Sequence, residues 1–280
     1  MLVNSKELFK KAQEEHFAIP SANVLDMETI KAHVEVAEEL GLPLIIGVAE
    51  GHLGPNMTLE DVAIIGKKYA EAASVPVVLH LDHGMSVETC KKAIDLGFTS
   101  VMIDASMKSF DENVATTKEV VEYAAAKDVS VEAEIGHVAS NFDTSDTEAL
   151  YTQPEEAAKF AELSGCDSLA ISIGTAHGVY QAKAIPEISF DSLHAIHAAT
   201  PCPLVLHGGS GSGDDNLNRC AKEGISKVNI YTDLYLAARE SLAKAMEEND
   251  AKCDFRILMA AIKDGTKSCL KHYYEVFETK

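Results

Sequence analysis

Eight short runs of β-forming residues alternate with helical segments along the whole chain, and this alternation limits the fold more than any other feature of the sequence. Strands that alternate with amphipathic helices form a parallel sheet. Eight such units without a break favour a closed barrel over a doubly wound sheet, which more often has fewer strands and a glycine-rich dinucleotide turn near its start. We expect strands at 17–24, 43–49, 76–83, 100–106, 130–136, 168–176, 203–208 and 227–232.

The segments between these strands have apolar residues near three- and four-residue spacing, as amphipathic helices do. Further helices are expected at 4–15 before the first strand, at 234–248 after the eighth, and at 255–276. With no linker, low-complexity tract or internal repeat, the sequence predicts a single domain over 1–280, an α/β TIM (β/α)8 barrel with an N-terminal helix and an extra C-terminal helix. Glycines expected just after the ends of helices are Gly41, Gly97, Gly165 and Gly224.

The charge of the chain excludes some partners. It has 24 Lys and Arg against 44 Asp and Glu, a net charge of -20, which argues against nucleic acid or an anionic membrane surface as its target. No apolar run approaches the roughly 18 residues that a membrane span needs, and the N-terminus is a charged amphipathic segment, so we expect a cytoplasmic protein. An anionic substrate would then need a local positive centre, such as a metal ion or helix N-termini.

Polar residues gather at the carboxyl ends of the predicted strands, where the active site of a TIM barrel lies. Three of them, His83, His177 and His207, each adjoin a glycine. A lone histidine is more often structural, but three neutral imidazoles converging from strand ends leave an open fourth position, as in catalytic zinc sites. We interpret His80 as a core or supporting group one layer lower.

Carboxylates accompany these histidines. Asp82 adjoins His83 and is the natural proton donor and acceptor. Glu132 and Glu134 lie two apart on one strand and so face the same side, where burial would cost several kcal/mol unless they are paired or bound to metal. Asp104, at the end of the fourth strand, could support the same cation.

Glycine-rich segments follow the sixth and seventh strands, at 173–178 and 207–213, and a polar segment, 229–233, leads from the eighth strand into the next helix. The loops after strands seven and eight are where TIM barrels commonly bind phosphate, using backbone N–H groups and helix N-termini. Such loops are a weak signal alone, and their position beside two proposed ligands strengthens it. The long connection at 137–153 predicts a mobile lid or a plain surface excursion. The proposed phosphate and substrate residues are Gly208, Gly209, Ser210 and Thr232.

The segments AIPSANVLDMETIKA, VVLHLDHG, VEAEIG, ISIGTAHGVY, LVLHGGSG and KVNIYTDL resemble, in order, the class II metal-dependent fructose/tagatose-bisphosphate aldolase family over nearly the whole chain. The resemblance implies zinc on the three histidines, with Glu134 near the metal and Asp104 at a secondary site for a monovalent or divalent cation. It implies that Asp82 is the acid/base at the hydroxyl of the cleaved bond, and that Asn23 and Asn229 hold substrate or enediolate. Gly178, with Gly208, Ser210 and Thr232, would bind the phosphate of dihydroxyacetone phosphate.

The chain departs from the family pattern at three places. The family's lid loop has Gly-Gly and then an acid, whereas this chain has a different loop in which Asp143 would take the role of that acid. Tyr235 stands where a basic residue often meets a second phosphate, and Glu50 places an acid in the strand-two loop. Together they predict a substrate whose distal half lacks phosphate, although Arg239 or Lys183 could supply the missing charge.

The predicted function is reversible zinc-dependent retro-aldol cleavage of a ketose phosphate, similar to fructose or tagatose bisphosphate, to dihydroxyacetone phosphate and an aldehyde. One alternative is an aldolase for a ketose 1-phosphate with a non-phosphorylated distal end. Another is a metal-dependent sugar-phosphate epimerase or dehydratase, and a third is a catalytically silent binding barrel. The resemblance also implies a homodimer or homotetramer.

Overall fold

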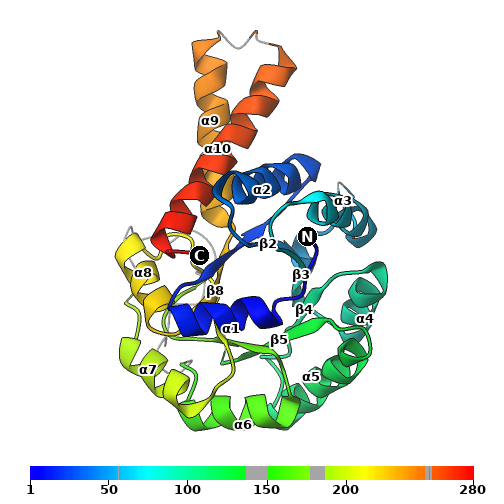
Figure 1. The fold of residues 1–280 in the computed structure, drawn as a ribbon, viewed down its shortest axis with the longest axis vertical. Coiled ribbons are helices and arrows are strands. Elements are labelled where there is room, and N and C mark those ends of the chain that lie inside the picture. Colours follow the sequence, from blue (N-terminus) through cyan, green and yellow to red (C-terminus); the bar gives the residue numbers. More distant parts are fainter. Residues whose placement is uncertain (56, 137–150, 177–186, 250–251, 253) are drawn as a thin grey trace.

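Eight parallel strands close into a barrel in sequence order, β1 to β8, as the sequence predicted (Figure 1). The computed structural model describes residues 1–55, 57–136, 151–176, 187–249, 252 and 254–280. The strands are β1 (Ile19–Asn23), β2 (Leu44–Ala49), β3 (Val77–Gly84), β4 (Ser100–Ile103), β5 (Ser130–Ile135), β6 (Ser168–Ile171), β7 (Leu204–Leu206) and β8 (Ile225–Ile230).

Helices surround the barrel, and the hairpin of α9 and α10 extends outward from this ring (Figure 1). Among the described helices, none combines the length and apolar composition that crossing a membrane requires. The described helices are α1 (Lys6–Glu15), α2 (Met27–Leu40), the short 3-10 helix η1 (Glu50–His52), α3 (Leu59–Ala72), α4 (Val87–Leu96), α5 (Phe110–Ala125), α6 (Pro154–Ser164), α7 (Phe190–Ala199), α8 (Asp214–Lys222), α9 (Thr232–Glu248) and α10 (Phe255–Val276).

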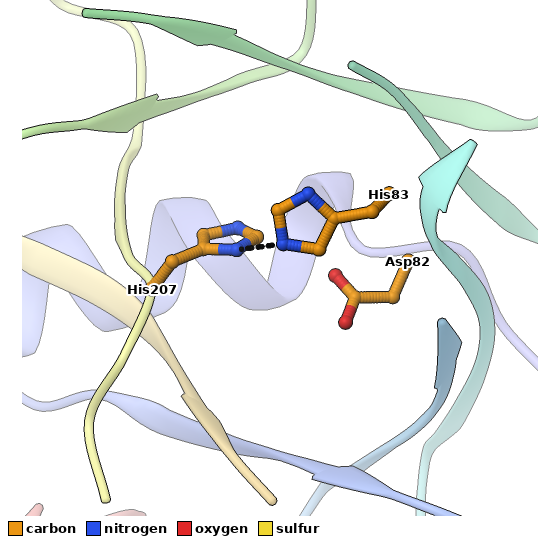
Figure 2. Close-up of side chains that lie close together, drawn as sticks. All are labelled: Asp82, His83 and His207. Carbon is orange, nitrogen blue, oxygen red and sulfur yellow. Dashed lines mark hydrogen bonds between the residues drawn. The ribbon is translucent and has the colours of Figure 1, made fainter. Parts of the chain in front are cut away.

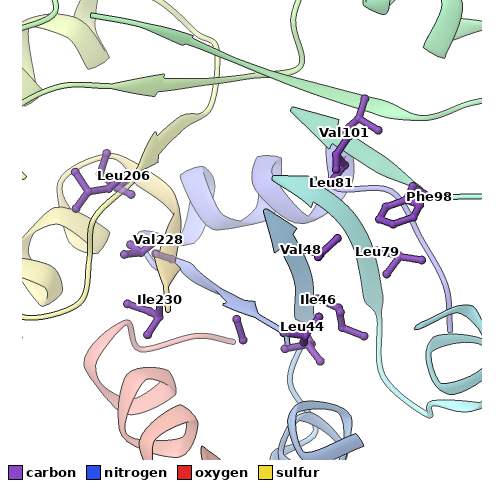
Figure 3. Packing of buried hydrophobic residues seen from close by; sticks show 14 of the residues in the cluster. Leu44, Ile46, Val48, Leu79, Leu81, Phe98, Val101, Leu206, Val228 and Ile230 are labelled. Atoms are coloured by element: carbon purple, nitrogen blue, oxygen red, sulfur yellow. The ribbon is translucent and has the colours of Figure 1, made fainter. Parts of the chain in front are cut away.

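Alternation along each strand divides the side chains between two environments. Residues of one parity, such as Leu79 and Leu81 of β3, belong to the large apolar core with the surrounding helices (Figure 3). Residues of the other parity point into the barrel, because successive side chains of a strand face opposite sides. In β3 the polar inward residues are His80 and Asp82, both almost fully buried. The barrel interior is therefore partly polar, and this polarity leads to the site.

Helix α1 covers one end of the barrel (Figure 1). Its Phe9 and Ala12 pack with residues near the amino ends of the first three strands, including Ile45 and Val78. The Ser5 hydroxyl, just before α1, also donates to the Ser130 hydroxyl at the start of β5, at 2.8 Å. This apolar cover closes the amino-terminal end, so the polar interior opens at the carboxyl ends of the strands.

Several predicted boundaries were wrong at the carboxyl ends of strands. β4, β6 and β7 stop at Ile103, Ile171 and Leu206, earlier than predicted, because the chain turns out of the ladder there. Gly174 has a φ of 122°, which ends any extended run toward 176. Helix α9 begins at Thr232, two residues before its predicted start.

Three of the four glycines expected at helix ends are confirmed. Gly41, Gly97 and Gly165 have φ angles of 70°, 95° and 70° and occupy left-handed positions immediately after α2, α4 and α6. Gly224 differs: α8 ends at Lys222 with Glu223 as its cap, and Gly224 follows one residue later with a φ of 134°.

Candidate active site

Two consecutive residues at the end of β3, Asp82 and His83, lie beside His207 (Figure 2). In a regular strand, neighbouring side chains would point to opposite faces. The backbone breaks this rule: His83 has a φ of 47°, a left-handed conformation that is rare for residues other than glycine. The pairing of β3 with β4 shifts register between Leu81 and Gly84. This irregularity brings an acid and an imidazole to one site.

Asp82 is held by two amides. Asn23 Nδ2 donates to its Oδ2 and Asn229 Nδ2 to its Oδ1, each at 2.9 Å, and the carboxyl is only 2 % exposed. Burial acts to raise the pKa of Asp82, but the neighbouring charges of His83 and His207 outweigh it, and the pKa lies well below its usual range. Asp82 is therefore a fixed, ionised carboxylate at the mouth of the barrel.

His83 is oriented by Asp104. Its Nδ1 lies 2.9 Å from Asp104 Oδ2, while Asp104 Oδ1 accepts from the Ser106 hydroxyl at 2.7 Å. Burial acts to lower the pKa of His83, but Asp82, the bond to Asp104 and Glu134 act more strongly in the other direction and raise the pKa to about 9. The surrounding carboxylates thus favour a positive charge at this ring.

His207 follows β7 and is fully buried. Its Nε2 lies 2.9 Å from Glu132 Oε1, and its Nδ1 lies 2.9 Å from His83 Nε2 (Figure 2). Burial lowers the pKa of His207, as does the charge of His83. When each ring is neutral and donates a hydrogen bond to its carboxylate, the two facing nitrogens both carry lone pairs, so a proton or a metal ion has to lie between them.

The donor atoms fit a divalent metal. Asp82, His83 and His207 have potential ligand atoms within 4.8 Å of one another, and so do His83, Asp104 and Glu134. Imidazole nitrogens and carboxylate oxygens are ligands that zinc accepts, and carboxylates that orient the far nitrogen of a ligating histidine are typical of zinc sites. Three predicted site residues, His177, Gly178 and Asp143, lie outside the described residues.

Hydrogen bonds join the two loops predicted to bind phosphate, the one after β7 and the one before α9. Ser210 Oγ accepts from the backbone N–H groups of Tyr231 and Asp233, at 3.3 and 3.2 Å, and Asp233 Oδ2 accepts from Gly211 N at 3.0 Å. Thr232 lies at the first turn of α9 and is 7 % exposed. The loop after β7 therefore meets the amino end of α9, where an anion is favoured.

Two glycines of this loop have structural reasons to be glycine. Gly208 has a φ of 67°, and a Cβ there would lie 2.5 Å from the Ala176 carbonyl oxygen. A Cβ on Gly209 would lie 2.5 Å from Val228 Cγ1. The close approach of these loops thus depends on the absence of side chains.

Glu50 has different partners from those expected of a substrate-binding acid. Its carboxylate accepts from Met85 N at 2.6 Å and from the Thr89 hydroxyl at 2.9 Å, at the start of α4. Its predicted contact with substrate stays a prediction.

Tyr235 belongs to an aromatic group. Its ring centroid lies 5.4 Å from that of Tyr231, which stacks on His52 at 4.2 Å. Burial lowers the pKa of His52, with opposing influences from Asp82 and His83. His52 therefore lies within electrostatic reach of the site, and an aromatic surface extends from there along the start of α9.

Lys227, Tyr231 and His52 were not among the site residues predicted from the sequence. Lys227 had a detectable signal, since a lysine in a predicted barrel strand with the same parity as Asn229 must point inward. No signal in the sequence indicated Tyr231 and His52, because their rings stack across two loops that are distant in sequence.

A closed parallel barrel with imidazoles, carboxylates and glycine-rich loops at the carboxyl ends of its strands has the arrangement of a TIM-barrel enzyme. The chain belongs to the class II fructose-bisphosphate aldolase family, whose model matches residues 3–280. Membership of an aldolase family implies a lyase that acts on a small sugar phosphate.

Relatives cover nearly the whole chain. A fructose-bisphosphate aldolase of Staphylococcus aureus is 36% identical over 99% of this chain and 98% of its own length. A 6-phospho-5-dehydro-2-deoxy-D-gluconate aldolase of Bacillus licheniformis is 39% identical over 98% of this chain and 94% of its own. The crystal structure of the YdjI aldolase from Escherichia coli K12 superposes with a TM-score of 0.88 at 34% identity, covering 100% of this chain and 98% of that one.

Proposed function

We propose that this protein is a zinc-dependent aldolase that reversibly cleaves a ketose phosphate to dihydroxyacetone phosphate and an aldehyde. The observation that carries the proposal is the ionised Asp82, held by two amides beside the facing nitrogens of His83 and His207. An aldol cleavage needs a base at the hydroxyl of the carbon that becomes the aldehyde, and a positive centre for the charge left on the other fragment.

His83 and His207 would hold the zinc together with His177, with Glu134 near it. When bound, zinc supplies a Lewis acid that stabilises negative charge on substrate oxygens. One carboxylate oxygen of Asp82 accepts the hydroxyl proton and returns it in the reverse direction, while Asn23 and Asn229 keep the carboxylate in place. Asp104, through His83, is proposed at the secondary cation position.

The phosphate of the substrate is proposed to lie against Gly208, Gly209, Ser210 and Thr232, with Gly178. These residues form the junction between the β7 loop and the amino end of α9. Backbone N–H groups and a helix N-terminus attract an anion without a cationic side chain, which suits a protein with a net charge of -20.

The test is a retro-aldol screen of ketose phosphates, coupled to detection of dihydroxyacetone phosphate, on protein stripped with chelator and then reloaded with zinc. Cleavage should disappear with the metal and return with zinc. Asp95→Asn, at an exposed carboxylate of α4 that pairs with Lys127, is the control for Asp82 variants. If the zinc-loaded protein changes the substrates but keeps their carbon skeletons, the reaction is epimerisation or dehydration; if it changes none of them, the barrel is silent.

The aromatic group supports a narrower proposal, a ketose 1-phosphate whose distal end is not phosphorylated. His52, Tyr231 and Tyr235 offer aromatic rings rather than cationic side chains, and Glu50 lies in the same short helix as His52. Sugar C–H groups pack well on aromatic faces, whereas a second phosphate would need donors or cations there. The names of the relatives denote more than one substrate, so sequence similarity leaves the choice open.

Comparison of fructose 1-phosphate with fructose 1,6-bisphosphate tests this choice. We expect the larger kcat/KM for the monophosphate. Comparable values for the two would refute the narrower proposal and leave the aldolase itself intact. We also propose a homodimer or homotetramer, which sedimentation equilibrium would measure.

A further inference from the structure

A lysine lies inside the barrel beneath the site. Lys227 is in the middle of β8, is 0% exposed, and shares its inward parity with Asn229 two residues later. Lysine is almost never fully buried without a partner. The groups around Lys227 must therefore compensate for the burial of its charge.

The ammonium group has three protons and three acceptors. Nζ donates to Glu132 Oε2 at 2.7 Å, to Glu132 Oε1 at 2.9 Å and to His80 Nε2 at 3.1 Å. Because His80 Nε2 accepts, its Nδ1 carries the ring proton and donates to the Ser100 hydroxyl at 2.9 Å. Burial lowers the pKa of His80 to about 3, consistent with a neutral ring.

Glu132 connects this lysine with His207. Its Oε1 accepts both from Lys227 Nζ and from His207 Nε2, each at 2.9 Å. With Nε2 of His207 protonated, Nδ1 is the nitrogen with the lone pair, and it faces His83 Nε2 at 2.9 Å. The position of the Glu132 carboxylate thus decides which nitrogen of His207 faces the site.

An ion pair by itself would not explain this arrangement, because buried pairs are often replaceable by apolar residues without loss of stability. What an apolar residue could not do is hold both oxygens of Glu132 at fixed positions. Without the two Lys227 bonds, the carboxylate would lose its ammonium partner and could rotate away from Nε2 of His207.

We propose that Lys227 is a positioning residue that, by holding Glu132, fixes His207 as the Nε2-protonated tautomer and directs its Nδ1 into the site. The consequence for metal binding rests on the proposed function, because it takes His207 as a ligand. The tautomer itself can be measured without metal.

The first measurement is 15N NMR of the His207 ring in the metal-free protein, which distinguishes protonated from unprotonated ring nitrogens. Wild type should show a proton on Nε2 and none on Nδ1. Lys227→Met should show a mixture of tautomers or the opposite one. A wild-type ring protonated on Nδ1 alone would overturn the proposal, whatever the variants do.

The second measurement is the zinc dissociation constant by chelator competition. Lys227→Met should weaken zinc binding about 10- to 100-fold, the range for groups that orient metal ligands. In a Glu132→Gln background, the same substitution should change the constant less than about twofold, because the carboxylate that Lys227 holds is gone. An equal loss in both backgrounds, or none in either, would contradict the proposal.

Val228→Ala is the matched control. Val228 is the next residue of β8, is equally buried, and belongs to the outer apolar core. It should lower the thermal midpoint without changing the His207 tautomer or the zinc constant; if it changes them as Lys227→Met does, the effect is general loosening and the proposal fails. Lys227→Gln serves where Lys227→Met does not fold, and should show a smaller shift in the same direction. A wild type that binds no zinc would refute the proposed function but leave the NMR test standing.

Discussion

Asp82→Asn should remove catalysis while leaving the fold almost unchanged. The substitution keeps the shape of the side chain but replaces one accepting oxygen by an NH2 donor. In wild type both oxygens accept from amides, Oδ2 from Asn23 and Oδ1 from Asn229, at 2.9 Å. One amide would therefore face a donor in the variant.

A rotation of one of the two amides can restore the hydrogen bond. Among the described residues, neither Asn23 Oδ1 nor Asn229 Oδ1 has a hydrogen-bond partner. Rotation of either amide by half a turn presents its oxygen to the new NH2 group. We expect a change in the free energy of unfolding within about 1 kcal/mol, or a shift in thermal midpoint of no more than about 2–4 °C.

The effect on rate should be much larger. A positioned general base contributes roughly 10²- to 10⁴-fold, which is about 3–5 kcal/mol of activation free energy. Asp82→Ala is a poorer test, because it leaves two buried amides without an acceptor at about 1–3 kcal/mol each.

The assay is retro-aldol turnover at saturating zinc, since Asp82 lies among the potential metal ligands and its charge contributes to metal affinity. Thermal melts and zinc content of the same samples accompany it. If Asp82→Asn retains more than about a tenth of wild-type kcat with zinc bound, Asp82 is not the base and the reasoning from its two amide bonds is wrong.

Four further predictions concern the same site. Because burial lowers the pKa of His83 but the nearby carboxylates raise it to about 9, zinc must displace a proton below that pH: affinity should rise about tenfold per pH unit up to about 9 and then level, and a pH-independent constant in chelator titrations would contradict this. Protonation of His83 also stabilises the metal-free protein. This stabilisation is fully present below the usual pKa of 6.5 and is lost as pH rises through about 9. The thermal midpoint should therefore fall over that interval, and a rise would refute the assignment. Gly208→Ala, at φ 67° and with its Cβ 2.5 Å from the Ala176 carbonyl oxygen, should raise KM for phosphorylated substrate about tenfold or more, since strain there is on the order of 1–3 kcal/mol; an unchanged KM would place the phosphate elsewhere. Tyr231→Ala should lower kcat/KM about 2- to 10-fold for substrates with a long distal end, the range for a lost aromatic contact, and an equal loss for the shortest substrates would argue against a distal role.

The fold could be predicted because its signal repeats. Eight strands, each followed by a helix with apolar residues at helical spacing, leave few arrangements that bury every apolar face. The ends of β4, β6 and β7 could not be predicted, because there the chain leaves the ladder through turns that depend on contacts with other loops, as at Gly174.

The site was predictable to the extent that strand ends meet at one edge of a barrel. That rule brought Asp82, His83, His207 and Asn229 together. Spacing could not reveal that His83 adopts a positive φ, nor which nitrogen of each ring faces inward. Those details come from Asp104 and Glu132, whose partners are distant in sequence and known only in three dimensions.

The cover that α1 places over the barrel has a consequence for solvent. Among the described residues, Phe9 and Ala12 cover the amino end, so water should reach the polar interior from the carboxyl ends of the strands. The hydrogen bonds that join Ser100, His80, Lys227 and Glu132 are then shielded from solvent at the amino end. Deleting residues 1–16 would uncover Ile45 and Val78 at the amino end, and water should then reach the buried Lys227–Glu132 pair from that side as well.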